Sequence, residues 1–514
     1  MSIGTAITIE PYLEDGQIGF IVVHPEGTIQ DISPGEWERM DGSEKDKLEA
    51  LANNSQKWKL PARPDYEKYE RKWEFMRDGV DEGRVGEIYE KYLQDVCNDL
   101  AVRMGRYFRA FCYFEDERHY TLLASFVIQT FLKNQFPTSP ILLFDGVSGS
   151  GKSTAMTALK YVGYRALFIS DYSTASLVDE VYDHGVTILL DESLRNISSD
   201  RGLALNTFLV NGFNKETAIY GRKDLKTYRS VVKNHYTCVA VTTLGGEIPV
   251  DLRNRSMMIT MALPDDNVNL EEIGYLEDAE LEWENHPDSI RSDLYALKIL
   301  TDSERASGVR IGGLFFEQFR QNTKRRLKHK QDDRYLYGHI HDILYTPEIT
   351  GRDRAIAYVH YTIGQAMMRE QEILEYILDN RNNIFTHKTT TTESVLVKAY
   401  AEVVIERHQE DHPTIKGLEN LIDERELMIV SRKISMPEIH RKYRELRERE
   451  GWDQREMEPA RTLTVKFKKL RIPFEERGGR VNYINSSDPD FLPNFWKAAK
   501  QYLDPETVAL FRKI

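Results

Sequence analysis

Hydrophobic and polar positions change their period several times along the chain, and each change marks a structural element. Short strand-like runs over residues 6–9 and 18–23 predict a small, partly β N-terminal module. Over residues 83–113 and 117–134, apolar positions recur every three or four residues, which predicts two long amphipathic helices. We expect these helices to pack against their neighbours and to carry no chemistry.

From residue 138 onward, short apolar runs alternate with helical segments. The predicted strands cover residues 141–144, 166–170, 186–190, 236–241 and 256–261, and the helices between them cover 155–161, 174–183 and 202–214. This alternation predicts a parallel, doubly wound α/β sheet. Ligands of such sheets bind at the carboxyl ends of the strands, so the residues there are the candidates for chemistry.

The first of these strands leads into a phosphate-binding motif. Its residues match G-x-x-x-x-G-K-[ST] throughout: Gly146, Val147, Ser148, Gly149, Ser150, Gly151, Lys152, Ser153 and Thr154. The glycines let backbone N–H groups curl around a triphosphate, and the following helix start favours the same anion. We expect Lys152 to neutralise the β- and γ-phosphates and Ser153 to ligate Mg²⁺, so the predicted cofactors are ATP and Mg²⁺. The alternative is a chance glycine-rich turn.

Acidic and hydroxyl residues end two further strands. Asp191 follows a continuous apolar run and is expected to complete the Mg²⁺ shell with Ser153, with water between them. Glu192 is placed to orient and deprotonate the attacking water. A buried Asp-Glu pair without cations would be costly, which favours a functional role. Thr243 or Thr242 is expected to polarise the same water from the next strand.

A basic insertion, residues 211–235, separates the strand that ends at Asp191 from the next strand. Its cations are Lys215, Arg222, Lys223, Lys226, Arg229 and Lys233. With Gly221 as a turn near its middle, the insertion is predicted to form a β-hairpin with a basic tip. The hairpin is either a solvated surface or a loop that grips nucleic-acid phosphates in a central channel, through Lys215, Arg222, Lys223 and Lys226.

Two arginines, Arg253 and Arg255, precede the fifth strand. Arg255 is the candidate for an arginine finger that completes the site of a neighbouring subunit, with Arg253 as the alternative. A surface salt bridge in a monomeric ATPase is the other interpretation.

The C-terminal segment follows a different pattern. Ser435 and Glu438 form a predicted capping box for a helix that runs to about residue 450. A second helix over about 459–470 and a Gly-Gly hairpin before 481–484 complete the layout of a winged helix. Residues 461–480 hold seven Lys or Arg and two Glu, which favours DNA binding over a protein–protein role. The predicted DNA contacts are Arg461, Lys466, Lys469 and Arg480.

Overall composition narrows these possibilities. The formal net charge of −13 argues against a wholesale nucleic-acid binder, but it allows local basic surfaces because salt screens charge beyond about 8–10 Å. The three cysteines, Cys97, Cys112 and Cys238, have no zinc or disulfide spacing, as expected for a reduced compartment. No apolar run is long enough to span a membrane, and no secretory signal is visible. We expect a cytoplasmic protein.

Five segments together resemble AAA+ helicase-like ATPases of plasmids, proviruses and phages, which are similar in organisation to superfamily III and minichromosome-maintenance helicases. The segments are Phe136 to Leu143, Gly146 to Thr154, Leu190 to Glu192, Phe208 to Phe213 and Leu252 to Ser256. The resemblance covers about residues 85–370 and implies a ring, usually hexameric, that translocates on DNA during replication. It also implies a helical lid in which Arg354, or less favourably Arg352, senses the γ-phosphate. Thr242 and Thr243 depart from the asparagine usual in that family, and no primase motif precedes the ATPase.

The expected architecture is therefore an AAA+-type P-loop parallel sheet with a helical lid. An N-terminal α+β module with a linker is predicted over residues 1–80, and a helical collar over 81–137. The ATPase core is predicted over 138–345, the lid over 346–414, and a winged-helix DNA-binding domain with a C-terminal helix over 415–514. The favoured function is that of an ATP-dependent oligomeric DNA helicase or translocase in mobile-element replication. Two alternatives are an initiator or loader that does not unwind DNA, and an ATP-gated effector that senses DNA.

Overall fold

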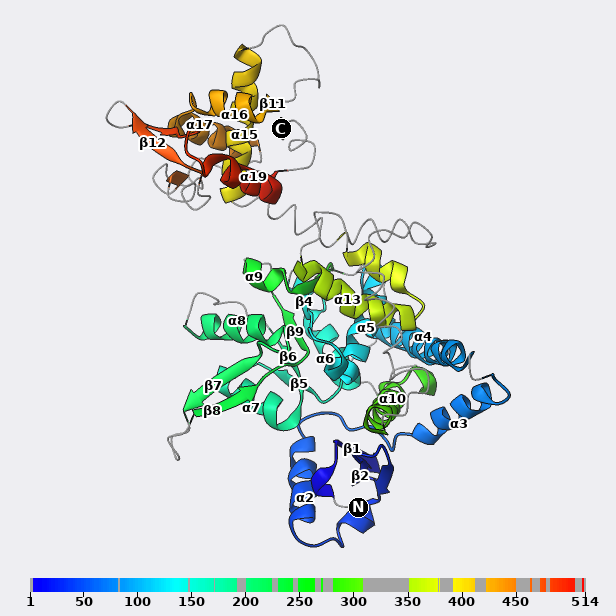
Figure 1. Ribbon diagram of the computed structural model, residues 1–514. Helices are drawn as coiled ribbons and strands as arrows, with labels where there is room; N and C mark the ends of the chain where they lie inside the picture. The colour runs from blue at the N-terminus through cyan, green and yellow to red at the C-terminus, as the bar shows by residue number, and fades with distance from the viewer. Residues whose placement is uncertain are drawn as a thin grey trace. The chain divides into compact units, whose positions relative to one another are not determined.

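The chain divides into two compact units, Met1–Asn380 and Arg381–Ile514. A computed structural model (Figure 1) describes most of both. The described residues are 3–81, 84–146, 148–170, 172–191, 200–223, 230–243, 248–263, 270, 281–307, 351–377, 379, 392–411, 422–449, 463–464, 472–477, 481–503 and 511–512. Within these residues, no helix combines the length and the apolar character needed to cross a membrane.

The first unit is built on a five-stranded sheet with the order β10-β4-β9-β6-β5. All neighbouring strands run parallel, which confirms the predicted α/β sheet. The strands are β4 (Ile141–Gly146), β5 (Ala166–Ile169), β6 (Thr187–Leu190), β9 (Val239–Thr242) and β10 (Ser256–Met261). The connecting helices are α6 (Lys152–Val162), α7 (Thr174–His184), α8 (Asp200–Gly212) and α9 (Val250–Arg253). The Ser173 side chain caps α7 by accepting a hydrogen bond from the Ser176 amide at 3.1 Å.

The strand order determines which residues meet at the carboxyl edge of the sheet. β9 lies between β4 and β6, with Thr242 opposite Phe144 and Val241 opposite Leu190. Since Asp191 directly follows Leu190, it comes next to Thr242 at this edge. On the other side of β4, Met261 of β10 pairs with Gly146. The ends of all four strands therefore surround the start of the phosphate-binding motif.

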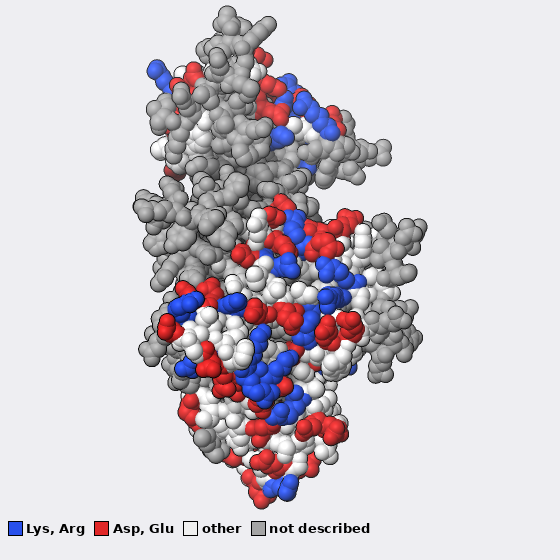
Figure 2. Space-filling model, turned by 90° about the vertical axis from the view of Figure 1, so that its right-hand side faces the viewer, with Lys and Arg blue, Asp and Glu red and all other residues white. Residues whose placement is uncertain are grey.

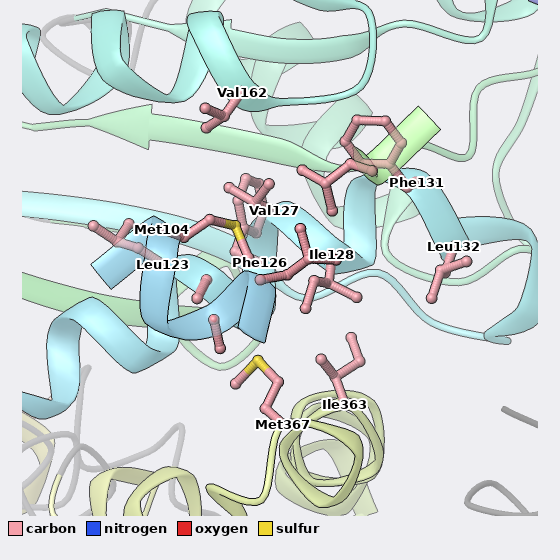
Figure 3. Packing of buried hydrophobic residues seen from close by; sticks show 14 of the residues in the cluster. Met104, Leu123, Phe126, Val127, Ile128, Phe131, Leu132, Val162, Ile363 and Met367 are labelled. Carbon is pink, nitrogen blue, oxygen red and sulfur yellow. The ribbon is translucent and has the colours of Figure 1, made fainter. Parts of the chain in front are cut away.

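Long helices cover the sheet and supply most of the core. They are α4 (Val85–Phe111), α5 (Arg118–Leu132), α10 (Pro287–Ser307) and α13 (Gly351–Ala366). Figure 3 shows side chains of α4, α5, α6 and α13 packed against one another, with Met104 and Phe126 in the middle and Ile363 on the α13 side. Every residue of α5 from His119 to Leu132 except Thr121 is buried, because the helix is enclosed by its neighbours. The two predicted amphipathic helices are α4 and α5.

The N-terminal module is an antiparallel sheet, β1-β2-β3, with three helices. Its elements are β1 (Thr8–Glu14), β2 (Gln17–Val23), β3 (Ile29–Ile32), α1 (Pro34–Trp37), α2 (Ser43–Ser55) and α3 (Tyr66–Arg77). A buried carboxylate joins this module to the parallel sheet. Glu10 of β1 accepts hydrogen bonds from Tyr164 at 2.8 Å and Arg165 at 2.9 Å, and Lys298 of α10 lies 3.4 Å away. We call Glu10, Tyr164, Arg165 and Lys298 the Glu10 cluster.

A β-hairpin projects from the sheet between β6 and β9 in the chain. Its strands are β7 (Ile219–Lys223) and β8 (Ser230–Asn234), which run antiparallel. The predicted hairpin is thus confirmed, but the position of its turn is corrected. Gly221 lies inside β7 opposite Val232, and the two strands continue to pair for two residues beyond it, so Gly221 is not the turn.

The second unit has its own hydrophobic core, formed by helices and two short β-pairs. Its elements are α15 (Thr392–Asp411), α16 (Glu424–Ser431), α17 (Met436–Arg449), α19 (Phe491–Tyr502), β11 (Ile422–Asp423), β12 (Phe474–Arg477), β13 (Val481–Ile484) and β14 (Phe511–Arg512). The strands β12 and β13 pair antiparallel and form the hairpin that was predicted next to residues 481–484. Of the predicted second basic helix, only Leu463 and Thr464 are described, and both are helical.

Helix caps in this unit differ in part from the prediction. At the start of α17, the Glu438 carboxylate accepts hydrogen bonds from both the amide and the hydroxyl of Ser435, at 2.8 and 2.7 Å. In a full capping box the serine hydroxyl accepts a hydrogen bond from a backbone amide of the helix. Here the Ser435 hydroxyl donates to Glu438. A full capping box occurs instead at α16, where Asp423 and Glu426 each accept from the backbone amide of the other.

Candidate active site at the carboxyl edge of the sheet

The phosphate-binding motif forms a loop between β4 and α6, as its sequence predicts. Gly149 and Gly151 have φ angles of 85° and 87°, a left-handed conformation that side chains disfavour. Gly151 is the residue before α6, so the helix begins at Lys152 with its unpaired amides at the loop. Val147 lies outside the described residues. The loop and the helix start form the anion-binding shape expected of this motif.

Gly146 is required here because β10 lies against it. A Cβ atom on Gly146 would come within 2.3 Å of the Met261 carbonyl oxygen and 2.9 Å of the Ser150 hydroxyl. No side chain fits at that distance from backbone. The end of β10 therefore fixes one wall of the loop, and any larger residue at position 146 would displace either the loop or β10.

Lys152 lies inside the loop. Its side chain is largely buried, and its ammonium donates a hydrogen bond of 2.7 Å to the Gly146 carbonyl. The Ser150 hydroxyl lies 3.5 Å from the same ammonium. The cation is thus held where the chain curls around it, which is the place expected for a lysine that neutralises phosphate charge.

Asp191 is hydrogen-bonded both to α6, the helix that follows the phosphate-binding loop, and to the sheet. Its Oδ2 accepts a hydrogen bond from the Ser153 hydroxyl at 2.9 Å, and its Oδ1 accepts one from the Thr242 hydroxyl at 2.6 Å. Three segments that are far apart in sequence therefore meet at one carboxylate. The predicted pairing of Ser153 with Asp191 is present in the geometry. The contact with Thr242 does not follow from the sequence.

The two threonines at the end of β9 have different environments. Thr242 has no exposed surface and contacts Asp191. Thr243 is 4% exposed, and its backbone amide donates to the Phe144 carbonyl at 2.8 Å. Successive side chains of a strand point to opposite faces, so only one of the two can share a face with Asp191. Of the two alternatives, the structure brings Thr242 to the carboxylate. Glu192 lies outside the described residues.

Asp191 and Ser153 fit a Mg²⁺ site. A carboxylate oxygen and a hydroxyl oxygen 2.9 Å apart are hard oxygen ligands of the kind that Mg²⁺ prefers, and Mg²⁺ usually takes few protein ligands beside water and phosphate oxygens. Ser153 is exposed and Asp191 is partly exposed, so both are open to solvent. The residues present therefore suit Mg²⁺ bound to a nucleotide in the adjacent loop.

Arg255 lies at the opposite edge of the sheet from the loop. Its carbonyl accepts from the amide of Ile141, the first residue of β4, whereas the phosphate loop follows Gly146. The five residue steps along β4 from Ile141 to Gly146, at about 3.3 Å each, separate Arg255 from its own loop by roughly 17 Å. Its guanidinium donates to the Asp251 carbonyl at 2.7 Å and lies over the Phe213 ring, 6.0 Å from its centroid. Arg255 therefore cannot reach the phosphates of its own site.

The remaining predicted residues are placed only in part. Arg352 and Arg354 lie in the first turn of α13, and Arg222 and Lys223 lie on β7, but the structure does not describe these side chains. Lys226, Arg461, Lys466, Lys469 and Arg480 lie outside the described residues. Lys215 is partly exposed and donates to the Asn134 carbonyl at 3.1 Å.

Charge on the described surface is mixed. On the face drawn in Figure 2, Lys and Arg side chains are interspersed with Asp and Glu side chains, with one larger group of Lys and Arg in the lower middle that acidic side chains border. The hairpin cation Lys233 follows the same pattern, since Asp179 and Asp183 of α7 lie 3.0 and 3.3 Å from its ammonium. Lys233 therefore anchors β8 to α7.

Comparisons with known proteins find similar solved structures but no matching family or curated protein. No protein-family model matches the chain, and no curated protein matches it significantly. Among solved structures, the active helicase Cch of SCCmec type IV is similar over 96% of this chain and 95% of that chain, with a TM-score of 0.33 and 12% identity. The A-form apo structure of the NrS-1 C-terminal region is similar over 69% of this chain and 87% of that chain, with a TM-score of 0.23 and 13% identity. At these TM-scores, the assignment of the site rests on its own geometry.

Proposed function

We propose that the chain is a Mg²⁺-dependent ATPase that works as an oligomeric DNA helicase or translocase in the replication of a mobile element. The observation that supports the ATPase most directly is the meeting of Ser153 and Asp191, 2.9 Å apart, beside a loop that holds Lys152 at its centre. A structural loop has no need for this combination, whereas a nucleoside triphosphatase requires all three groups.

Each residue has a distinct task in this proposal. The loop amides and Lys152 bind and orient the phosphates, and Ser153 with Asp191 holds Mg²⁺. The metal ion supplies charge neutralisation at the β- and γ-phosphate oxygens when it is bound. Glu192, directly after Asp191, orients a water molecule and accepts its proton. The water oxygen forms a bond to the γ-phosphorus while the bond from that phosphorus to its bridging oxygen breaks, and ADP and phosphate are released.

The position of Arg255 supports a shared active site. It lies roughly 17 Å from its own loop by strand spacing, yet the resemblance assigns an arginine finger to this segment. A second copy of the chain would have to present Arg255 to the γ-phosphate. This requirement supports a ring, with six subunits as the expectation from the resemblance.

The hairpin supports DNA as the partner. In the chain, β7 and β8 lie between β6, which leads to Asp191, and β9, which ends at Thr242. A force that DNA exerts on the hairpin would therefore act on the two segments that flank the site. The insertion carries Arg222 and Lys223 on β7, which suits contact with backbone phosphates.

Two measurements on one set of proteins test the proposal. Wild-type protein is expected to hydrolyse ATP faster with single-stranded DNA present and to open a forked duplex, whereas Lys152→Ala is expected to do neither. Lys160→Ala, a change of the same type in the same helix but outside the loop, is the matched control and should behave as the wild type. Strong ATPase activity without strand opening or directional movement would favour the initiator or loader. A chain without ATPase activity would contradict the proposal.

A further inference from the structure

The Asp191 carboxylate is held from two sides. Its Oδ2 faces Ser153 on the loop helix, where the metal ion is proposed to bind, and its Oδ1 faces Thr242 in the sheet. The Thr242 contact, at 2.6 Å, is the shorter of the two. A carboxylate fixed through one oxygen keeps the other oxygen in a single position, so Thr242 determines where the metal-facing oxygen lies.

The single hydrogen of the Thr242 hydroxyl limits what else this group can donate to. A threonine hydroxyl has one hydrogen, and an ionised carboxylate can only accept. The hydrogen between Thr242 and Asp191 therefore belongs to Thr242, and it is used in this bond. The same hydroxyl cannot polarise the attacking water by donating to it while the bond exists. The geometry therefore does not allow Thr242 to polarise the attacking water in this way, which is the role expected for a residue at the end of this strand.

The surroundings make Thr242 a rigid support. It has no exposed surface, and β9 pairs with β4 on one side and β6 on the other. A β-branched side chain has few rotamers on such a strand. Ser153, in contrast, is exposed at the start of α6. Of the two contacts to Asp191, the one from the sheet is therefore the fixed one.

We infer that Thr242 is a positioning residue that orients the Asp191 carboxylate for Mg²⁺, in place of a residue that contacts water or phosphate. The inference rests on the proposed Mg²⁺-dependent ATPase. Removal of the hydroxyl should weaken Mg²⁺ binding and leave turnover at saturating Mg²⁺ nearly unchanged. Groups that orient metal ligands typically contribute about 10–100-fold in metal affinity or activity.

The test compares Thr242→Val, which keeps the shape and removes the donor, with Thr242→Ser, which keeps the donor. The first readout is the Mg²⁺ concentration at half-maximal ATPase rate. The second is the affinity for a fluorescent ATP analogue with Mg²⁺ and with EDTA, which requires no turnover. For Thr242→Val we expect the Mg²⁺ requirement to rise by about 10–100-fold and the Mg²⁺-dependent gain in affinity to shrink equally, with Thr242→Ser close to wild type. Thermal unfolding checks the fold, and Thr242→Ala replaces any valine variant that does not fold.

Three results would overturn the inference. The first is a Thr242→Val protein that keeps the wild-type Mg²⁺ requirement but turns over slowly at every concentration, which would place Thr242 on the water or the phosphate. The inference would equally fail if valine, serine and wild type behaved alike, or if nucleotide binding by the wild type ignored Mg²⁺. Should the wild type bind Mg²⁺-nucleotide without hydrolysing it, the ATPase proposal would fail, and the binding comparison would still decide the role of Thr242.

Discussion

Glu10 is a buried residue that helps to join the N-terminal module to the parallel sheet. It is 1% exposed and lies between Arg165 at 2.9 Å and Lys298 at 3.4 Å, both of them also buried. Lys298 has a second acid, Asp302, beside it. Arg165 also donates to the Ile9 carbonyl at 2.8 Å. The Glu10 carboxylate is thus the acidic partner of Arg165, and it shares Lys298 with Asp302.

We expect Glu10→Gln to destabilise the first unit strongly. The amide keeps the shape but leaves the charge of Arg165 and, in part, that of Lys298 without a partner, and removal of one member of a buried ion pair typically costs about 3–5 kcal/mol. Unfolding in urea, followed by circular dichroism, measures the change. Glu14→Gln, an exposed position on the same strand, is the control and should lie close to wild type. A loss below about 1 kcal/mol, the size of a surface pair, would show that the Glu10 cluster does not stabilise the fold.

At the residue scale, the chemistry could be predicted better than the contacts. Lys152, Ser153 and Asp191 could be identified because a motif and a strand end specify them locally. The choice between Thr242 and Thr243 could not be made, because it depends on which residue of β9 shares a face with Asp191 in the folded sheet. The partners of Glu10 escape prediction for a related reason, since Arg165 and Lys298 are distant in sequence and no local pattern links them.

Among the elements, α5 and α13 share two buried histidines. Burial lowers the pKa of His119 to about 4 and that of His360 to about 3, against an ordinary value of 6.5. His360 Nδ1 lies 2.9 Å from the Ser125 hydroxyl, and His119 packs edge-on against the Tyr376 ring. Both histidines are therefore neutral in the folded protein at physiological pH.

This burial predicts acid sensitivity. A folded-state pKa below the unfolded value means that the unfolded chain binds more protons, so the stability is complete above about pH 6.5 and falls as the pH drops toward 4. Between pH 7.5 and 5, each histidine should cost about 2 kcal/mol of the free energy of unfolding. His119→Phe, which keeps a ring and cannot titrate, should lose about that much less than wild type over this range. Equal losses in variant and wild type, measured by urea unfolding at both pH values, would contradict the prediction.

The hairpin β7–β8 gives a prediction about DNA. Replacing Arg222 and Lys223 by alanine should weaken binding of single-stranded DNA and lower the salt dependence of log K by about 0.7 for each phosphate that is no longer neutralised. Basal ATPase activity without DNA should stay unchanged. Lys72→Ala, which removes an exposed cation from α3, is the control. An unchanged salt slope, measured by fluorescence anisotropy, would show that these hairpin cations do not bind phosphates.

Elements were predictable where one strong local signal defined them. The bounds of β10 agree with the apolar run 256–261, and α4 and α5 agree with the helical periodicity. Gly221 misleads the prediction because glycine is common in turns but also occurs within strands, and only the pairing with Val232 decides. Asp423 and Glu426 carry a local capping signal, D-x-x-E, of the same kind as the one at Ser435, and the sequence alone does not show which of the two forms the full box.

For the molecule as a whole, the prediction concerns assembly. Arg255→Ala should keep ATP binding and lose hydrolysis, because the finger acts on the neighbour's nucleotide. Mixed with Glu192→Gln subunits, it should recover activity at interfaces where an intact Glu192 meets an intact Arg255. Each variant alone is the control. Mixtures with no more activity than the separate variants, in assemblies shown to exchange subunits, would argue against a shared site.

Domain organisation depends on contacts between distant parts of the chain. The N-terminal module was expected as residues 1–80 with a linker, and the structure places it in the same compact unit as the sheet. Its own core is small, with Phe20, Val22 and Leu48 among its members, so it gains much of its burial from the neighbouring sheet and helices. Composition cannot show such a dependence, since the contacts come from distant parts of the chain.

The Glu10 cluster also has a consequence for synthesis on the ribosome. Arg165 is made 155 residues after Glu10, and Lys298 later still. At about 5–20 residues per second, Arg165 follows roughly 8–30 s after Glu10. During that interval the nascent β1 carries an ionised carboxylate with neither counter-ion yet translated. The Glu10 carboxylate can therefore be buried with both of its cations only after the ribosome has translated Lys298 in α10.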